Sequence, residues 1–119
     1  MSDIRIHVED GAGFFARAKT IARGLDAGGS VKSENHLSFG SLETLARTLT
    51  PKRWALLKTL RGMGPSSIRA LAIESGRDYK AVHTDTIALI EAGLIERNGD
   101  MQIHVPWTRI SADFELAAA

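Results

Sequence analysis

The stretch GRDYKAVHTDTIALIEAGLIERNGD, residues 76–100, is the most informative part of this sequence. It starts with polar side chains, continues as an apolar-striped segment and ends in Asn-Gly-Asp. Val82, Leu89 and Ala92 recur at spacings of seven and three, which predicts an amphipathic helix over about residues 78–92. The early turns of this helix are polar and the later turns are apolar, so we expect its two halves to face different surroundings.

A β-hairpin is predicted directly after this helix. Gly93 stands where a left-handed residue ends a helix. The segments 94–97 and 101–105 are strand-like, and Asn98-Gly99-Asp100 lies between them. Asn-Gly between two strands is the strongest short hairpin signal.

Two further helices are predicted before residue 76. Thr50 is an N-cap with proline at the first helical position. Trp54, Leu57 and Leu60 are expected to face inward, with Leu56 as a further candidate. A second, short helix starts after Ser66 or Ser67, carries an apolar stripe and ends at Gly76. Three short helices followed by a hairpin are the order of a winged helix-turn-helix, in which Gly76 forms the tight turn.

The remaining segments predict a smaller unit before these helices. Residues 4–9 alternate as a strand, residues 12–26 have helical spacing, and residues 36–40 are a candidate short strand, with a linker over 28–35. Ser41 caps a helix with Leu42, Leu45, Ala46 and Leu49 as its stripe. We therefore expect an α+β protein with a strand-helix-strand unit over residues 1–40, a winged helix-turn-helix over 41–109 and a tail over 110–119. Residues 110–119 are expected to form a short helix or a frayed end.

Composition excludes several classes. The chain has 119 residues, 44% of them hydrophobic and 24% charged, which is ordinary for a globular protein. It has no cysteine, no apolar run long enough for a membrane span and no secretory signal, which favours a cytoplasmic protein. Net charge is +1 overall, but residues 50–109 carry nine basic and six acidic side chains, which hints at a polyanionic partner.

The segment SSIRALAIESGRDYKAVHTDTIALIEAGLIERNGD resembles the winged-helix repressors of the MarR and ArsR type. With LTPKRWALLKTLRGMGP before it and HVPW after it, the chain resembles in particular small prokaryotic MarR-like DNA-binding proteins, some of them antitoxin-like. The resemblance covers residues 39–107. It implies a transcriptional regulator of the repressor kind that binds double-stranded DNA as a homodimer, and a small toxin as a further partner. Thr86 departs from this pattern, which has an aliphatic residue there, and Ile87 and Ile90 stand where it has polar ones.

The candidate DNA-binding residues lie at helix starts and on the hairpin. Basic and polar side chains suit phosphates and base edges, and a helix N-terminus offers free N–H groups to a phosphate. The expected set is Ser66, Ser67, Arg69, Arg77, Tyr79, Lys80, His83, Thr84, Arg97 and Asn98. Candidates for a dimer or partner surface are Phe14, Phe15, Ile87 and Ile90. The alternative function is a winged-helix protein-interaction module that does not bind DNA, and a third is general nucleoid or RNA binding.

Catalytic and metal chemistry are not expected. The four histidines, His7, His36, His83 and His104, lack metal-ligand spacing. Asp85 and His83 lie two residues apart on a helix and so point to different faces, and the chain has no nucleophile elbow or glycine-rich phosphate loop. We therefore expect no enzyme activity, cofactor or metal.

Overall fold

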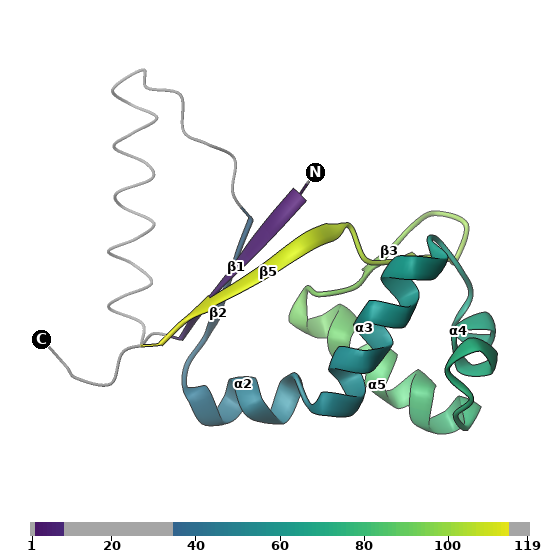
Figure 1. Ribbon diagram of the computed structural model, residues 1–119, viewed down its shortest axis with the longest axis horizontal. Coiled ribbons are helices and arrows are strands. Elements are labelled where there is room, and N and C mark those ends of the chain that lie inside the picture. Colours follow the sequence, from purple (N-terminus) through teal and green to yellow (C-terminus); the bar gives the residue numbers. More distant parts are fainter. Residues whose placement is uncertain (1, 9–34, 115–119) are drawn as a thin grey trace, which may run out of the picture. The chain divides into compact units, whose positions relative to one another are not determined.

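The computed structural model describes residues 2–8 and 35–114, which form an α+β protein. The chain divides into two compact units (Figure 1). The first comprises Met1–Leu45 with Thr108–Ala119, and the second is the continuous segment Ala46–Trp107. The predicted helix over 12–26 and the predicted linker over 28–35 fall almost wholly outside the described residues.

The first unit contains a three-stranded sheet in the order β2-β1-β5. Strand β1 is Ser2–Val8, and it pairs in parallel with β2, Asn35–Phe39, in a register that places Ile6 beside Leu37. Ile4 and Ile6 are buried and the residues between and before them are exposed, so the alternation seen in the sequence points one face inward. Both strands predicted from the sequence are confirmed.

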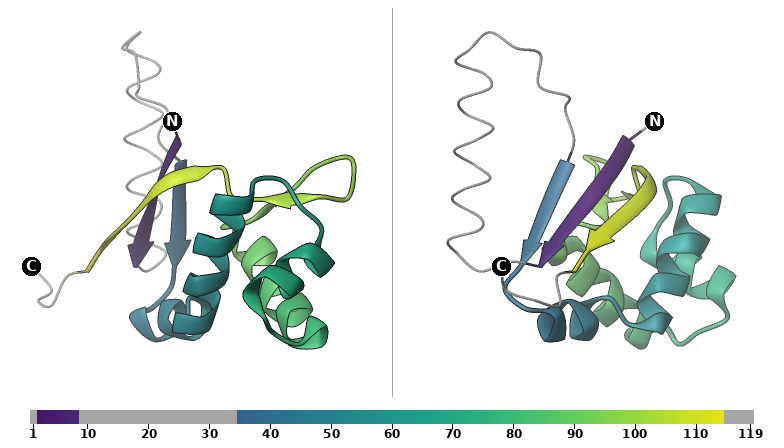
Figure 2. Two further views of the ribbon diagram at one scale, coloured as in Figure 1. Left: turned by 45° about the vertical axis from the view of Figure 1, so that its right-hand side comes forward. Right: turned by 60° about the vertical axis from the view of Figure 1, so that its left-hand side comes forward.

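Strand β5, Trp107–Asp113, is the third strand of this sheet. The prediction of a helix or frayed end from residue 110 was therefore wrong for residues 110–113. The Thr108 hydroxyl donates to the Ser2 carbonyl oxygen over 3.2 Å, so the start of β5 lies beside the start of β1. The right-hand view of Figure 2 shows the three strands running side by side in the same direction.

Helix α2, Leu42–Thr48, is capped by Ser41 as predicted, because the Ser41 hydroxyl accepts from the Thr44 backbone N–H over 3.1 Å. Leu45 is its one buried residue, whereas Leu42 is 53% exposed. The predicted apolar stripe on this helix is therefore narrower than the sequence suggests.

Helix α3, Pro51–Met63, begins as predicted. The Thr50 side chain accepts from the Arg53 backbone N–H over 3.3 Å, and proline occupies the first helical position, where its missing N–H is not needed. The prediction that Trp54 faces inward was wrong, because Trp54 is 42% exposed. The buried stripe is Leu56, Leu57 and Leu60, and at about 100° per residue Arg53 lies closer to its direction than Trp54 does.

Helices α4, Ile68–Ser75, and α5, Tyr79–Ala92, meet across a tight turn at Gly76. Gly76 is left-handed, with φ of 67°, and its N–H bonds back to the end of α4. Gly93 ends α5 in the same way, with φ of 89°, as the sequence predicts. Ser67 caps α4 and Asp78 caps α5 through their side chains.

A hairpin of β3, Glu96–Arg97, and β4, Ile103–His104, follows α5. The backbone of Ser66, just before α4, exchanges two hydrogen bonds with Ile103, at 2.8 and 3.0 Å. This bridge ties the hairpin to the start of α4. The left-handed residue of the hairpin is Met101, with φ of 61°, rather than Gly99.

Helices α3, α4 and α5 pack against one another around one apolar core (Figure 2). Its buried apolar side chains come from the three helices, the hairpin, the segments on either side of the hairpin and the first residue of β5: Leu56, Leu57, Leu60, Leu71, Ala72, Val82, Leu89, Leu94, Ile95, Ile103, Val105 and Trp107. Three helices followed by a hairpin are compatible with a winged-helix-like class. Within residues 2–8 and 35–114, no helix has the length and apolar character needed to cross a membrane.

Candidate nucleic-acid interface

The first half of α5 presents a polar face to solvent. Tyr79, Lys80, His83 and Thr84 are exposed, at spacings that place them side by side on the helix. The rings of Tyr79 and His83 lie 5.9 Å apart between centroids, tilted by 40°. The Thr84 hydroxyl donates to the Lys80 carbonyl oxygen over 3.0 Å. The sequence prediction that these four side chains share an exposed face is confirmed.

The opposite side of α5 is anchored in the core. Val82 and Leu89 are fully buried, as predicted, and Ala92 is half-buried. Thr86 lies between them with 0% exposure, and its hydroxyl oxygen has no hydrogen-bond partner. Thr86 therefore takes the place of an aliphatic core residue.

Asp78 shapes the start of α5. Its carboxylate accepts from the Ala81 backbone N–H over 3.2 Å, so it satisfies one of the free N–H groups of the first turn. Its negative charge is also favourable beside the positive end of the helix dipole. Asp78 thus acts as a helix cap.

Arg77 does not belong to the exposed face, contrary to the sequence prediction. Its Nη2 donates to Asp85 Oδ2 over 2.8 Å, and its side chain is 25% exposed. Arg53 Nε donates to the other carboxylate oxygen of Asp85 over 3.1 Å. Because one carboxylate binds both guanidinium groups, these three residues join α3, the α4–α5 turn and α5.

The same cluster controls the pKa of Asp85. Burial by itself raises the pKa of this carboxyl group. The hydrogen bonds and positive charges of Arg77 and Arg53 outweigh burial, and the pKa lies below its ordinary value. Asp85 is therefore ionised at neutral pH and committed to the two arginines. It is therefore not free to accept a hydrogen bond from a nucleic-acid base.

The start of α4 supplies one exposed basic side chain and two serines. Arg69 is exposed in the first turn of α4. Ser67 is the cap, and its hydroxyl oxygen accepts from the Ala70 backbone N–H over 3.0 Å. The Ser66 hydroxyl donates to the Gly64 carbonyl oxygen over 2.8 Å, and the residue is half-buried. Ser66 therefore shapes the start of α4, and its hydroxyl proton is already used.

The two predicted DNA-contact residues of the hairpin differ in exposure. Arg97 is exposed in β3. Asn98 is half-buried, and its side-chain oxygen accepts from the backbone N–H groups of Asp100 and Gln102 over 3.0 and 3.1 Å. Asn98 therefore holds the turn together, and its acceptor is occupied. The tip also exposes Met101 and the acidic side chain of Asp100, whereas Glu96 lies at the start of β3 with its carboxylate 3.7 Å from His104 Nε2.

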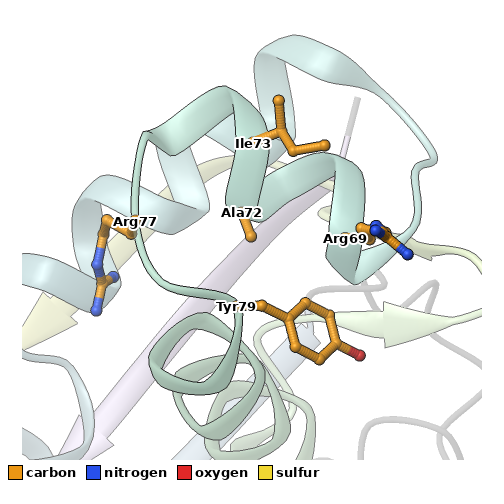
Figure 3. Close-up of a pocket in the computed structure, with 5 residues that line it drawn as sticks. All are labelled: Arg69, Ala72, Ile73, Arg77 and Tyr79. Carbon is orange, nitrogen blue, oxygen red and sulfur yellow. The ribbon is translucent and has the colours of Figure 1, made fainter.

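A hollow of about 590 Å³ lies between α4 and the start of α5. The described residues that line it are drawn in Figure 3: Arg69, Ala72, Ile73, Arg77 and Tyr79. Ile73 is 75% exposed, and the sequence pattern did not single it out. Its exposure could be predicted from its position on the helix, because Ile73 lies off the apolar stripe formed by Ile68, Leu71 and Ala72.

The predicted partner surface is only partly described. Phe14 and Phe15 lie outside the described residues. Ile87 and Ile90 follow His83 by four and seven residues, on the same side of α5, and both are half-buried within the chain itself. Contact with a second subunit stays a prediction for all four residues.

The titratable side chains do not form a metal-binding cluster in the described part of the chain. Among residues 2–8 and 35–114, no three His, Asp or Glu side chains gather so that they would hold a metal ion. His83 is exposed and Asp85 is bound to two arginines, so these neighbours in sequence face different surroundings.

The model of one protein family, HVO_A0114, matches residues 48–112. This match covers more than half of the chain, and the chain belongs to the HVO_A0114 family. The matched segment contains α3, α4, α5 and the hairpin, together with most of β5. No curated protein and no solved structure matches the chain.

Proposed function

We propose that this protein is a winged helix-turn-helix that binds double-stranded DNA and regulates transcription, with α5 as the helix that enters the major groove. The observation that carries this proposal is the division of α5 into two faces. Tyr79, Lys80 and His83 face solvent on its first turns, while Val82 and Leu89 fix the helix to the core. A helix in this role needs its N-terminal side chains free and its axis held.

The charges of the described residues support this face. Lys80 on α5 and Arg69 on α4 are exposed, and both suit phosphate oxygens. The capped N-terminus of α4 adds backbone N–H groups and a partial positive charge. The Arg53–Asp85–Arg77 cluster supports the same function indirectly, because it holds α5 against α3 and against the turn.

A repressor that acts as a cytoplasmic homodimer is the fuller form of this proposal. A single winged helix buries little DNA surface, and two-fold symmetry doubles it. The antitoxin role with a small toxin partner rests on the sequence resemblance alone and stays a prediction.

Electrophoretic mobility or fluorescence anisotropy with short random duplexes, repeated across salt concentrations, tests the proposal. DNA binding predicts that the logarithm of affinity falls with the logarithm of salt by about 0.9 per phosphate contact. Arg69→Ala and Lys80→Ala should each weaken binding and lower the slope by about that amount.

The matched control is Lys58→Ala, which removes the same charge from an exposed position on α3. It should leave the slope near that of the parent protein. Equal effects of all three substitutions would point to net charge rather than to this face. The absence of any shifted duplex at low salt would overturn DNA binding.

One observation favours the alternative of a protein-interaction module. The hairpin tip combines exposed Met101 with the acidic side chain of Asp100, and acidic groups repel phosphates. If the protein does not shift DNA at low salt, this tip is the surface to examine for a protein partner.

A further inference from the structure

An exposed branched aliphatic side chain borders the hollow between α4 and α5. Ile73 is 75% exposed, although an aliphatic side chain usually gains free energy by leaving water. It belongs to α4, one turn after Arg69, so the two side chains share a face of that helix. Tyr79, 51% exposed, approaches the same hollow from the start of α5 (Figure 3).

The hollow combines positive charge with apolar surface. The described residues that line it include two arginines and no acid. Arg77 is bound to Asp85, so Arg69 is the lining charge that stays available to a ligand. Ala72, Ile73 and the ring of Tyr79 supply apolar contact area. The partner that fits this combination is anionic and carries a small apolar group.

Duplex DNA offers one such group in its major groove, the 5-methyl group of thymine. We propose that Ile73 contacts a thymine methyl while Arg69 holds a neighbouring phosphate. This inference rests on the proposed DNA binding and adds to it a preference for thymine at a defined position of the site. The recognition is apolar, so it discriminates thymine from uracil, which presents the same hydrogen-bonding groups without the methyl.

The test removes the methyl group from the DNA. A preferred duplex is first selected from a random pool with the full chain, and each thymine in it is then replaced singly by deoxyuridine. At the thymine that meets Ile73, replacement should weaken binding about fourfold, the effect of one buried methyl group. Replacement of thymines elsewhere should have little effect.

The matching protein variant is Ile73→Ala, which is expected to fold because the removed side chain is exposed. With this variant the thymine and deoxyuridine duplexes should bind equally well. Met101→Ala is the control, since it shortens another exposed apolar side chain and should keep the fourfold ratio. Circular dichroism of both variants verifies that the helices are retained.

Each other outcome overturns the inference. If no thymine is sensitive to loss of its methyl group, or if the ratio persists in Ile73→Ala, Ile73 does not read thymine, and DNA binding itself still stands. Selection without any sequence preference also overturns the thymine contact and leaves DNA binding intact. If the chain shifts no duplex at low salt, DNA binding and the thymine contact fail together.

Discussion

Thr86 is a polar residue in an apolar core, and its replacement by valine should stabilise the protein. Thr86 is 0% exposed, and its hydroxyl oxygen has no hydrogen-bond partner. A threonine inside a helix commonly bonds to a backbone carbonyl one turn earlier, which offsets its burial. Thr86 lacks that hydrogen bond. On folding its hydroxyl group therefore loses its hydrogen bonds to water and gains none in return, which lowers the free energy of unfolding.

The magnitude follows from the group removed. A buried hydroxyl without a partner costs about 1–3 kcal/mol. Valine has nearly the shape of threonine and a similar helix propensity, so Thr86→Val removes this cost without a large change in packing. We expect the free energy of unfolding to rise by about 1–2 kcal/mol, and the thermal midpoint to rise by about 4–8 °C for each kcal/mol in a domain of this size.

Urea unfolding followed by circular dichroism measures this change. The urea midpoint should rise in Thr86→Val. The slope of the free energy of unfolding against urea concentration should stay the same, because the parent and the variant expose the same surface on unfolding. The control is Thr86→Ser, which keeps the hydroxyl and loses a methyl group, and it should be less stable by about 1 kcal/mol. A valine variant no more stable than the parent would contradict this expectation, since it would mean that the hydroxyl is satisfied.

Two further predictions concern the ion-pair cluster and the hairpin. Asp85→Asn should lower the free energy of unfolding by about 2 kcal/mol, less than for a fully buried pair because Arg53 and Arg77 are partly exposed. The pKa of Asp85 is lowered by folding, so its contribution is complete above the unfolded value of about 4 and is lost as pH falls through the folded pKa. Urea midpoints of parent and variant should therefore converge in acid, and a gap that persists there would contradict the assignment. Met101→Gly should raise the free energy of unfolding by about 0.5–1 kcal/mol, because glycine adopts the left-handed conformation without strain. Met101→Ala keeps the strain and is the control, and a glycine variant no more stable than the alanine variant in urea would count against a strained turn.

The helix boundaries of Ala46–Trp107 were predictable because local chemistry sets them. The residues that set these boundaries act within one turn of their own positions, so they can be recognised in a single sequence. They are Thr50 with the proline after it, the cap Ser67, Gly76 and Gly93. The exposed polar start of α5 was predictable for the same reason. Its buried stripe has helical spacing, and the remaining positions have to face elsewhere.

Features that depend on distant partners were not predictable. Strand β5 has no regular alternation, and its place is set by pairing with β1, about a hundred residues earlier. Arg77 looked free because its partner, Asp85, is eight residues further on, across the turn and along α5. Ile73 lies off the apolar stripe of α4, so its exposure could be predicted from spacing, but the hollow beside it depends on how α4 meets α5.

The pairing of β5 with β1 has a consequence for the order of events during synthesis. Ala46–Trp107 is one continuous segment, so it holds its three helices and hairpin as soon as its last residue has emerged. The sheet of the first unit is different, because β1 is made first and its neighbour β5 is made after the whole helical unit. The parallel pair β1 and β2 would wait with an unpaired edge until Trp107–Asp113 arrives. We therefore expect the helical unit to fold early on the ribosome and the sheet to close last.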